Sequence, residues 1–179
     1  MRALLQRTTG ARVRVGDEIV GEIGAGLVVL LGVGPDDDEA TTDALARRVT
    51  ELRIFDDAAG RTNLSLVDVG GAVLVVSQFT LFADTRRGRR PGFTGAAAPE
   101  LAERLYLRFA AALQGMGVDV ATGRFNPDGV RDYDLMVPAT VEALVHERHD
   151  EARARYEADA ETWREEYARE HGWTDPPKL

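Results

Sequence analysis

Two continuous apolar runs constrain the fold of this 179-residue chain more than any other feature. Residues 27–31 read Leu-Val-Val-Leu-Leu and residues 72–76 read Ala-Val-Leu-Val-Val, without a polar side chain in either run. Short apolar runs bounded by glycine and polar residues are typical of strands buried at the centre of a sheet. The sequence therefore predicts a sheet in which these two runs are buried strands.

Further strands are predicted on both sides of these runs. Residues 3–6, 11–15 and 18–23 alternate or run apolar, and Gly16-Asp17 has the composition of a hairpin turn. Shorter strands are expected at 53–55, at 118–121 and at roughly 130–137, with a turn over 56–62.

Two amphipathic segments predict helices. The carboxylates of residues 36–39 suit a helix N-terminus, because they accept hydrogen bonds from free N–H groups and favour the positive end of the helix dipole. That helix is expected to run to about Leu52, and the second from Pro99 to Met116. The apolar residues expected on their buried faces are Leu45, Val49 and Leu52 in the first and Leu101, Leu105, Leu107, Phe109 and Leu113 in the second.

The composition changes after residue 140. Residues 141–171 are charged and alanine-rich and contain neither proline nor glycine, which is typical of helix. Trp163 and Tyr167 lie at i, i+4 spacing and give this segment a partial apolar face. We therefore predict a domain at residues 1–140 and a helical C-terminal extension at residues 141–179 that packs on this domain or on a partner subunit.

The distribution of reactive side chains limits the chemistry of residues 1–140. Cysteine is absent, and the three histidines (His146, His149 and His171) and the single lysine, Lys178, all follow residue 140. Thiolate chemistry is therefore excluded, and no Ser–His pair can form within this domain alone. His146 and His149 have a spacing that suits either a shared metal or a solvated helix face, and without a third ligand we predict no metal site.

Glycine-rich segments do not indicate a phosphate-binding loop here. Gly24-Ala25-Gly26 precedes its strand, and Gly32-Val33-Gly34 is followed by Pro35 and four carboxylates that would repel phosphate. Both segments are predicted to be tight turns.

Residues 75–91, Val-Val-Ser-Gln-Phe-Thr-Leu-Phe-Ala-Asp-Thr-Arg-Arg-Gly-Arg-Arg-Pro, combine a buried strand end with a cluster of arginines. The polar residues around Phe79 allow either a plain strand-to-loop transition or a set of unpaired N–H groups that stabilise an oxyanion. The arginines form either a solvated loop or a contact for phosphates. Since the chain carries a net charge of −8, a polyanionic partner needs such a local basic patch.

The stretch VVSQFTLFADTRRGRRPGF at 75–93 closely resembles the signature of the D-aminoacyl-tRNA deacylases, once called D-tyrosyl-tRNA deacylases. The resemblance extends through residues 2–41, 53–66 and 122–125. It implies a compact α/β fold dominated by antiparallel strands with two packed helices, and a homodimer with active sites at the subunit interface. It also implies hydrolysis, without a cofactor, of the ester joining a D-amino acid or glycine to the tRNA 3′-terminal ribose.

The resemblance assigns roles to individual residues. In that family, backbone amides of the segment that reads Ser-Gln-Phe-Thr hold the substrate carbonyl, and the ribose 2′-hydroxyl assists the chemistry. The catalytic segment here is therefore Ser77, Gln78, Phe79 and Thr80, and Phe125 matches the aromatic that seats the terminal adenine. The arginines expected at the tRNA acceptor stem are Arg86, Arg87, Arg89 and Arg90.

The second family motif, Asn-x-Gly-Pro-Val-Thr, is replaced here by Leu-Met-Val-Pro-Ala-Thr at 135–140. In the family the Gly-Pro dipeptide enters the partner's pocket in the cis form and rejects L-amino acids. Valine before proline favours an extended trans arrangement, although a cis bond before proline costs only about 0.5–1 kcal/mol. Val137 and Pro138 are therefore the expected determinants of selectivity, and a trans bond predicts that small L-amino acids are accepted.

Three functions stay open at this point: a deacylase of mischarged aminoacyl-tRNA, a divergent paralogue acting on another acyl group, and a non-catalytic tRNA- or protein-binding dimer. The expected partners are aminoacyl-tRNA and a second copy of the chain, without a membrane or DNA partner. No apolar run reaches the ~18 residues of a spanning helix. Together with the lack of cysteine, this predicts a cytoplasmic protein.

Overall fold

The computed structural model describes residues 1–86, 90–125 and 133–136. The chain divides between Pro138 and Ala139, and all described residues belong to the first unit. The predicted boundary at residue 140 and the predicted C-terminal helix lie outside the described residues and stay predictions.

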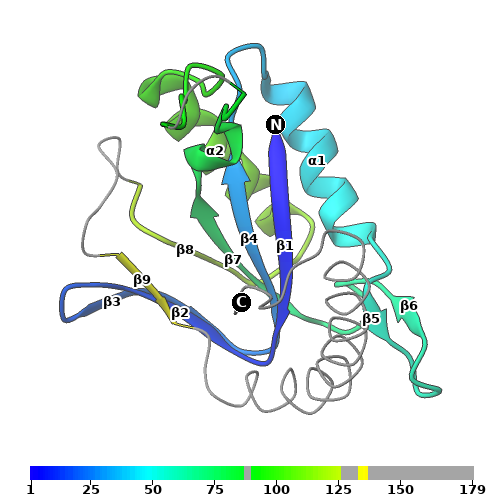
Figure 1. Ribbon diagram of the computed structural model, residues 1–179. Coiled ribbons are helices and arrows are strands. Elements are labelled where there is room, and N and C mark those ends of the chain that lie inside the picture. The colour runs from blue at the N-terminus through cyan, green and yellow to red at the C-terminus, as the bar shows by residue number, and fades with distance from the viewer. Residues whose placement is uncertain (87–89, 126–132, 137–179) are drawn as a thin grey trace, which may run out of the picture. The chain divides into compact units, whose positions relative to one another are not determined.

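A four-stranded sheet forms the centre of the first unit (Figure 1). Its strands lie in the order β1 (Arg2–Thr8), β4 (Gly26–Gly32), β7 (Ala72–Ser77) and β8 (Val120–Thr122). β1 runs antiparallel to β4, whereas β4, β7 and β8 run parallel to one another. The two apolar runs of the sequence are the neighbouring strands β4 and β7, as predicted.

The remaining described strands pair antiparallel. A second sheet has the order β3 (Glu18–Ile23), β2 (Ala11–Val15) and β9 (Tyr133–Met136), and β5 (Phe55–Asp56) pairs with β6 (Thr62–Leu64). Gly16 forms the predicted β2–β3 turn with a φ of 59°, a conformation that a Cβ atom disfavours. Antiparallel pairings outnumber parallel ones among the described strands, which confirms the predicted fold class, although the central sheet is mixed.

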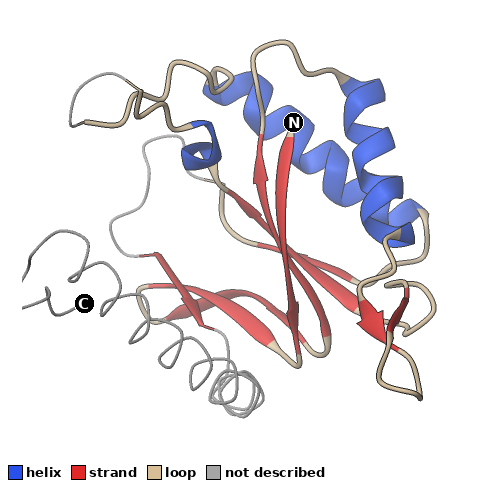
Figure 2. Ribbon diagram, turned by 45° about the vertical axis from the view of Figure 1, so that its right-hand side comes forward, coloured by secondary structure: helices blue, strands red, loops and turns tan. Residues whose placement is uncertain are grey.

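Two helices cover one face of the central sheet, and the β3-β2-β9 sheet lies toward the other face (Figure 2). Helix α1 spans Glu39–Glu51 and α2 spans Pro99–Gly115. Asp38 caps α1 by accepting a hydrogen bond from the Thr41 N–H at 2.7 Å, as the run of carboxylates predicted. Gly117, just beyond α2, has a φ of 82°.

Alternate residues of β4 and β7 are buried in two separate cores, because successive side chains of a strand point to opposite faces. Val29 and Val75 pack with residues of α1 and α2. Val28 and Leu74 pack with residues of β2 and β3. The central strands are therefore covered on both faces.

Two residues expected on buried helix faces are exposed. Leu52 is 38% exposed and lies just past the last residue of α1, and Leu107 is 54% exposed on α2. The buried positions are taken instead by shorter or partly polar side chains, including Thr42, Ala46 and Tyr106. Apolar spacing alone missed these residues, because a face packed closely on a sheet also accepts small side chains and a tyrosine with a bonded hydroxyl.

Tyr106 joins α2 to the ends of two strands. Its buried hydroxyl lies 2.9 Å from the Val75 carbonyl oxygen and 3.1 Å from the Gly123 carbonyl oxygen. The Gly123 N–H also donates to the Val75 carbonyl at 3.0 Å. These bonds hold the end of β8 against β7 at the edge where both strands leave the sheet.

Replacing Tyr106 by phenylalanine should therefore destabilise the protein although the ring is retained. Losing the hydroxyl leaves buried carbonyl groups with fewer donors, so the free energy of unfolding should fall by about 1–3 kcal/mol in urea denaturation. The control is Leu107→Ala on the same helix, whose exposed side chain should change stability by less than about 0.5 kcal/mol. Equal effects of the two substitutions would contradict this role of the hydroxyl.

Candidate functional site

The predicted catalytic segment begins where β7 ends. Ser77 is the last residue of β7 and lies opposite Leu31 of β4, and the Gln78 N–H donates to the Leu31 carbonyl at 2.8 Å. The backbone then turns into a short 3₁₀ helix, η1 (Phe79–Phe82). Ser77 and Gln78 are half-buried, whereas Phe79 and Thr80 are exposed.

This turn leaves two adjacent backbone N–H groups available. The first N–H groups of a helix have no acceptor within the helix. Among the described residues, none accepts a hydrogen bond from the Phe79 or Thr80 N–H, whereas Leu81 and Ala83 N–H donate to the Gln78 and Thr80 carbonyls at 3.3 and 3.0 Å. Two adjacent donors at an exposed strand end suit a carbonyl oxygen or an oxyanion.

Side chains add little reactive chemistry to this segment. The Thr80 hydroxyl accepts a hydrogen bond from the Gln78 side-chain amide. The described part of the chain contains no cysteine, histidine or lysine that would activate a hydroxyl nucleophile. Backbone donors are therefore its main means of acting on a substrate.

Aromatic rings lie beside these donors. The Phe79 ring is 41% exposed and meets the Phe93 ring edge to face, with centroids 5.1 Å apart and an interplanar angle of 77°. The pair places apolar surface next to the exposed N–H groups.

The arginine loop is closed at its base. Asp84 and Gly92 exchange two backbone hydrogen bonds of 2.7 and 2.9 Å. The Arg86 guanidinium donates to both carboxylate oxygens of Asp84 at 2.9 and 2.8 Å, which lowers the pKa of Asp84 and raises that of Arg86. Arg90 is exposed, and Arg87 and Arg89 lie outside the described residues.

The chain that carries Phe125 leaves the central sheet at the same edge as the predicted catalytic segment. Phe125 follows β8, which runs parallel to β7 with Thr122 opposite Val75. Because parallel strands end at the same edge, the chain after Thr122 and the chain after Ser77 emerge there together. The half-buried Phe125 ring packs against the Tyr106 ring, with centroids 5.8 Å apart.

The remaining predicted site residues are not described. Val137 and Pro138 lie outside the described residues, as do His146 and His149. Among the residues that the structure does describe, no cluster of three metal-ligating side chains occurs. No helix within this part of the chain is long and apolar enough to cross a membrane.

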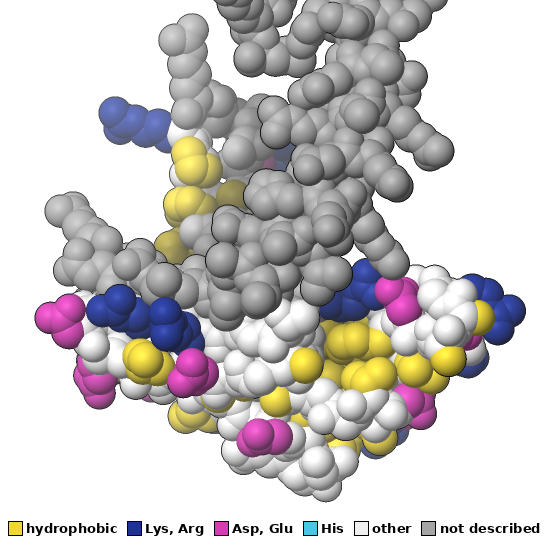
Figure 3. Space-filling view, turned by 90° about the horizontal axis from the view of Figure 1, so that it is seen from below, with side chains coloured by type: hydrophobic (Ala, Val, Ile, Leu, Met, Phe, Trp, Pro, Cys, Tyr) yellow, Lys and Arg dark blue, Asp and Glu magenta, His cyan; other side chains and the backbone are white. Residues whose placement is uncertain are grey.

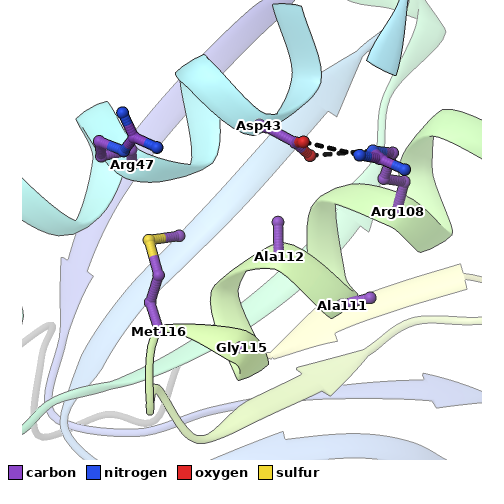
Figure 4. A pocket seen from close by; sticks show the side chains of 7 residues that line it. All are labelled: Asp43, Arg47, Arg108, Ala111, Ala112, Gly115 and Met116. Atoms are coloured by element: carbon purple, nitrogen blue, oxygen red, sulfur yellow. Dashed lines mark hydrogen bonds and ion pairs between the residues drawn. The ribbon is translucent and has the colours of Figure 1, made fainter. Parts of the chain in front are cut away.

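A cleft of about 430 Å³ lies elsewhere, between α1 and α2 (Figure 4). Arg108 of α2 donates to both carboxylate oxygens of Asp43 of α1 at 2.9 and 2.7 Å, which lowers the pKa of Asp43. Arg108 also pairs with Glu39 at 2.6 Å. These contacts join the two helices, and none of the residues lining the cleft belongs to the catalytic segment.

Several residues around the site were not predicted from the sequence. Asp84 pairs with Arg86, Phe93 packs on Phe79, and Arg2 contacts the end of η1. The Asp84–Arg86 pair had a usable signal, since opposite charges two residues apart in a loop can meet. Arg2 gave none, because its partner Leu81 lies 79 residues away.

Comparison with known proteins places most of this unit in one family. The pattern of the family described as D-Tyr-tRNA(Tyr) deacylase matches residues 4–135. A D-aminoacyl-tRNA deacylase of Symbiobacterium thermophilum is 58% identical over 125 residues, which cover 70% of this chain and 83% of the relative. One from Desulfatibacillum aliphaticivorans is 47% identical over 148 residues, covering 83% of this chain and all of the relative.

Solved structures with the same fold include the following two. One, named c-Myc DNA Unwinding Element Binding Protein, has a TM-score of 0.69 at 32% identity and covers 76% of this chain and 91% of its own. A probable eukaryotic D-amino acid tRNA deacylase has a TM-score of 0.61 at 18% identity, and the match covers 75% of this chain and 97% of that protein's chain. On the extent of the sequence match, this chain belongs to the D-Tyr-tRNA(Tyr) deacylase family.

Proposed function

We propose that this chain hydrolyses the ester bond between a D-amino acid, or glycine, and the 3′-terminal ribose of a tRNA. The observation that carries the proposal is the pair of N–H donors at Phe79 and Thr80, within the residues matched by the family. Relatives with 58% identity that are named D-aminoacyl-tRNA deacylases support it. Acyl transfer to water also fits a segment without a cysteine or histidine nucleophile.

In the proposed reaction the Phe79 and Thr80 N–H groups donate to the carbonyl oxygen of the ester. Water adds to the carbonyl carbon, and the negative charge that develops on the carbonyl oxygen strengthens both hydrogen bonds. The bond to the ribose 3′-oxygen then breaks, and the neighbouring 2′-hydroxyl accepts the proton of the attacking water and passes its own proton to this leaving oxygen. The protein itself orients the ester and supplies the dipoles of the two backbone N–H groups.

The terminal nucleotide and a second subunit complete the proposed site. Phe125 seats the adenine, and Val137 and Pro138 of the partner subunit contact the amino acid. The proposed protein is a cytoplasmic homodimer, and Leu4 of β1 and Ile19 of β3, each 48% exposed, are candidates for the contact between its two copies.

Local charge, not overall charge, would hold the tRNA. On the coloured part of the face shown in Figure 3, basic side chains lie beside acidic ones, without a broad basic surface. Since the chain carries a net charge of −8, the acceptor stem would meet the local cluster of arginines at residues 86–90. Asp84 pairs with Arg86 and partly offsets its positive charge, so the larger contribution falls to Arg90 and its neighbours.

Removing the Thr80 hydroxyl should change the rate little, whereas removing the ribose 2′-hydroxyl should slow the reaction strongly. We expect Thr80→Ala to retain most of its turnover of D-alanyl-tRNA. The same tRNA ending in 2′-deoxyadenosine should react about 10²–10⁴-fold more slowly, because the proton transfer is lost. Single-turnover rates with both substrates measure this, and full turnover of the deoxy substrate would refute substrate assistance.

The arginines should differ in their contribution to tRNA binding. Replacing Arg89 and Arg90 together by glutamine should flatten the dependence of log affinity on log salt by about one to two units. Arg86→Gln should change it by less, because Asp84 already partly offsets the charge of Arg86. Arg61→Gln, on the distant β5–β6 hairpin, is the control. An unchanged slope in the double variant would mean that the loop is merely solvated.

Selectivity should depend on position 137. With a trans Val137-Pro138 bond, the wild type should hydrolyse L-alanyl-tRNA as well as D-alanyl-tRNA. Val137→Gly should lower the L-alanyl rate relative to the D-alanyl rate, because it restores the family's Gly-Pro dipeptide. A wild type that rejects L-alanyl-tRNA, with no change in the variant, would be inconsistent with this expectation.

A further inference from the structure

We propose that Arg2 is a positioning residue that holds η1, and with it the Phe79 and Thr80 N–H groups, against the ends of β1 and β4. This inference rests on the proposed function, since it concerns the donors that act on the ester. Arg2 would not touch the substrate. It would act through the last two residues of η1.

The contacts of Arg2 converge on the end of this helix. Its Nη1 donates to the Leu81 carbonyl at 2.6 Å, and its guanidinium carbon lies 4.5 Å from the centroid of the Phe82 ring. A charged donor suits a carbonyl at a helix C-terminus, and a cation over an aromatic face is attracted to it. One side chain thus contacts both Leu81, by a hydrogen bond, and Phe82, by a cation–π interaction.

Two glycines make room for this arrangement. A Cβ atom on Gly32 would lie 3.0 Å from the Gln78 carbonyl oxygen and 3.0 Å from the Phe82 ring. A Cβ on Gly34 would lie 3.2 Å from the same ring. The Gly32-Val33-Gly34 segment is thus the floor on which η1 sits, and Arg2 lies opposite Gly32 in the β1–β4 register.

η1 needs such external contacts to hold its position. A four-residue 3₁₀ helix has little stability of its own, because few of its hydrogen bonds are internal. Its start is fixed by the Gln78–Leu31 hydrogen bond. Its other end is fixed by Arg2 and the glycine floor. If that end is released, the Phe79 and Thr80 N–H groups should no longer stay within hydrogen-bonding distance of the ester carbonyl oxygen.

An alternative role for Arg2 makes a different prediction. The Leu81 contact uses one of its N–H donors, so an exposed guanidinium can also meet a phosphate of the tRNA. In that case its loss should raise KM and flatten the salt dependence of binding. A positioning role should lower kcat with KM unchanged.

The test compares Arg2→Met and Arg2→Lys with the control Arg61→Met, an exposed arginine that pairs with Asp57 on the β5–β6 hairpin. Arg2→Met keeps an unbranched apolar stem but is shorter and loses the charge and the donors. Its kcat on D-alanyl-tRNA should fall roughly 10- to 100-fold, with KM within about twofold of wild type. Arg2→Lys should recover part of kcat, because an ammonium also suits the Phe82 ring and the Leu81 carbonyl.

A glycine pair tests the floor separately. Gly32→Ala should lower kcat like Arg2→Met, because its new methyl group displaces η1. Gly24→Ala is the matched control, since a Cβ there meets no atom within 4 Å. Melting temperatures of all variants show whether a loss of kcat reflects unfolding.

Amide hydrogen exchange of the unliganded protein gives a readout without substrate. In Arg2→Met the Leu81 and Ala83 amides should exchange roughly tenfold faster than in wild type, while the amides of β7 keep their rates. Wild-type protein that hydrolyses no aminoacyl-tRNA would defeat the proposed function, and the exchange data would still decide the role of Arg2. Unchanged exchange, an unchanged kcat in an active enzyme, or an effect on KM and salt dependence alone would overturn the inference.

Discussion

The parallel pairing of β4 with β7 determines where the candidate site lies. Its register places Ser77 opposite Leu31, and the Gln78 N–H makes the last hydrogen bond to β4 before the chain turns. Alternate side chains of both strands belong to separate cores, so a slip of one residue would exchange the two faces. The burial of these strands thus determines the residue at which β7 ends, and the Phe79 and Thr80 N–H groups follow directly after this end.

The same arrangement accounts for a site without reactive side chains. Residues 1–140 contain no histidine, cysteine or lysine, and their backbone donors need no change of protonation to act. Donors held in place by a sheet lose little energy to reorganisation when charge develops on a bound oxygen. Their effect depends on position, so the contacts proposed to hold the far end of η1 bear directly on it.

The sequence was sufficient for most elements and insufficient for their assembly. Apolar runs predicted β4 and β7, and the carboxylates of residues 36–39 predicted the start of α1, since these are local patterns. Strand direction leaves no such pattern, so the mixed central sheet could not be derived from residues alone. Spacing also favoured Leu107 over Tyr106, because the value of a buried hydroxyl depends on carbonyls contributed by β7 and β8. The catalytic role of residues 77–80 was predicted from the resemblance to a family, whereas their polarity alone also allowed a plain strand-to-loop transition.

The most direct test of the account is the backbone amide spectrum of the protein with a non-hydrolysable 3′-(D-alanylamino)-adenosine. If the Phe79 and Thr80 N–H groups hold the reacting carbonyl, these two amide protons should show the largest downfield shifts of the Ser77–Ala83 segment on binding, as expected for newly formed hydrogen bonds. Binding that perturbs other residues and leaves both amides unchanged would contradict the central claim.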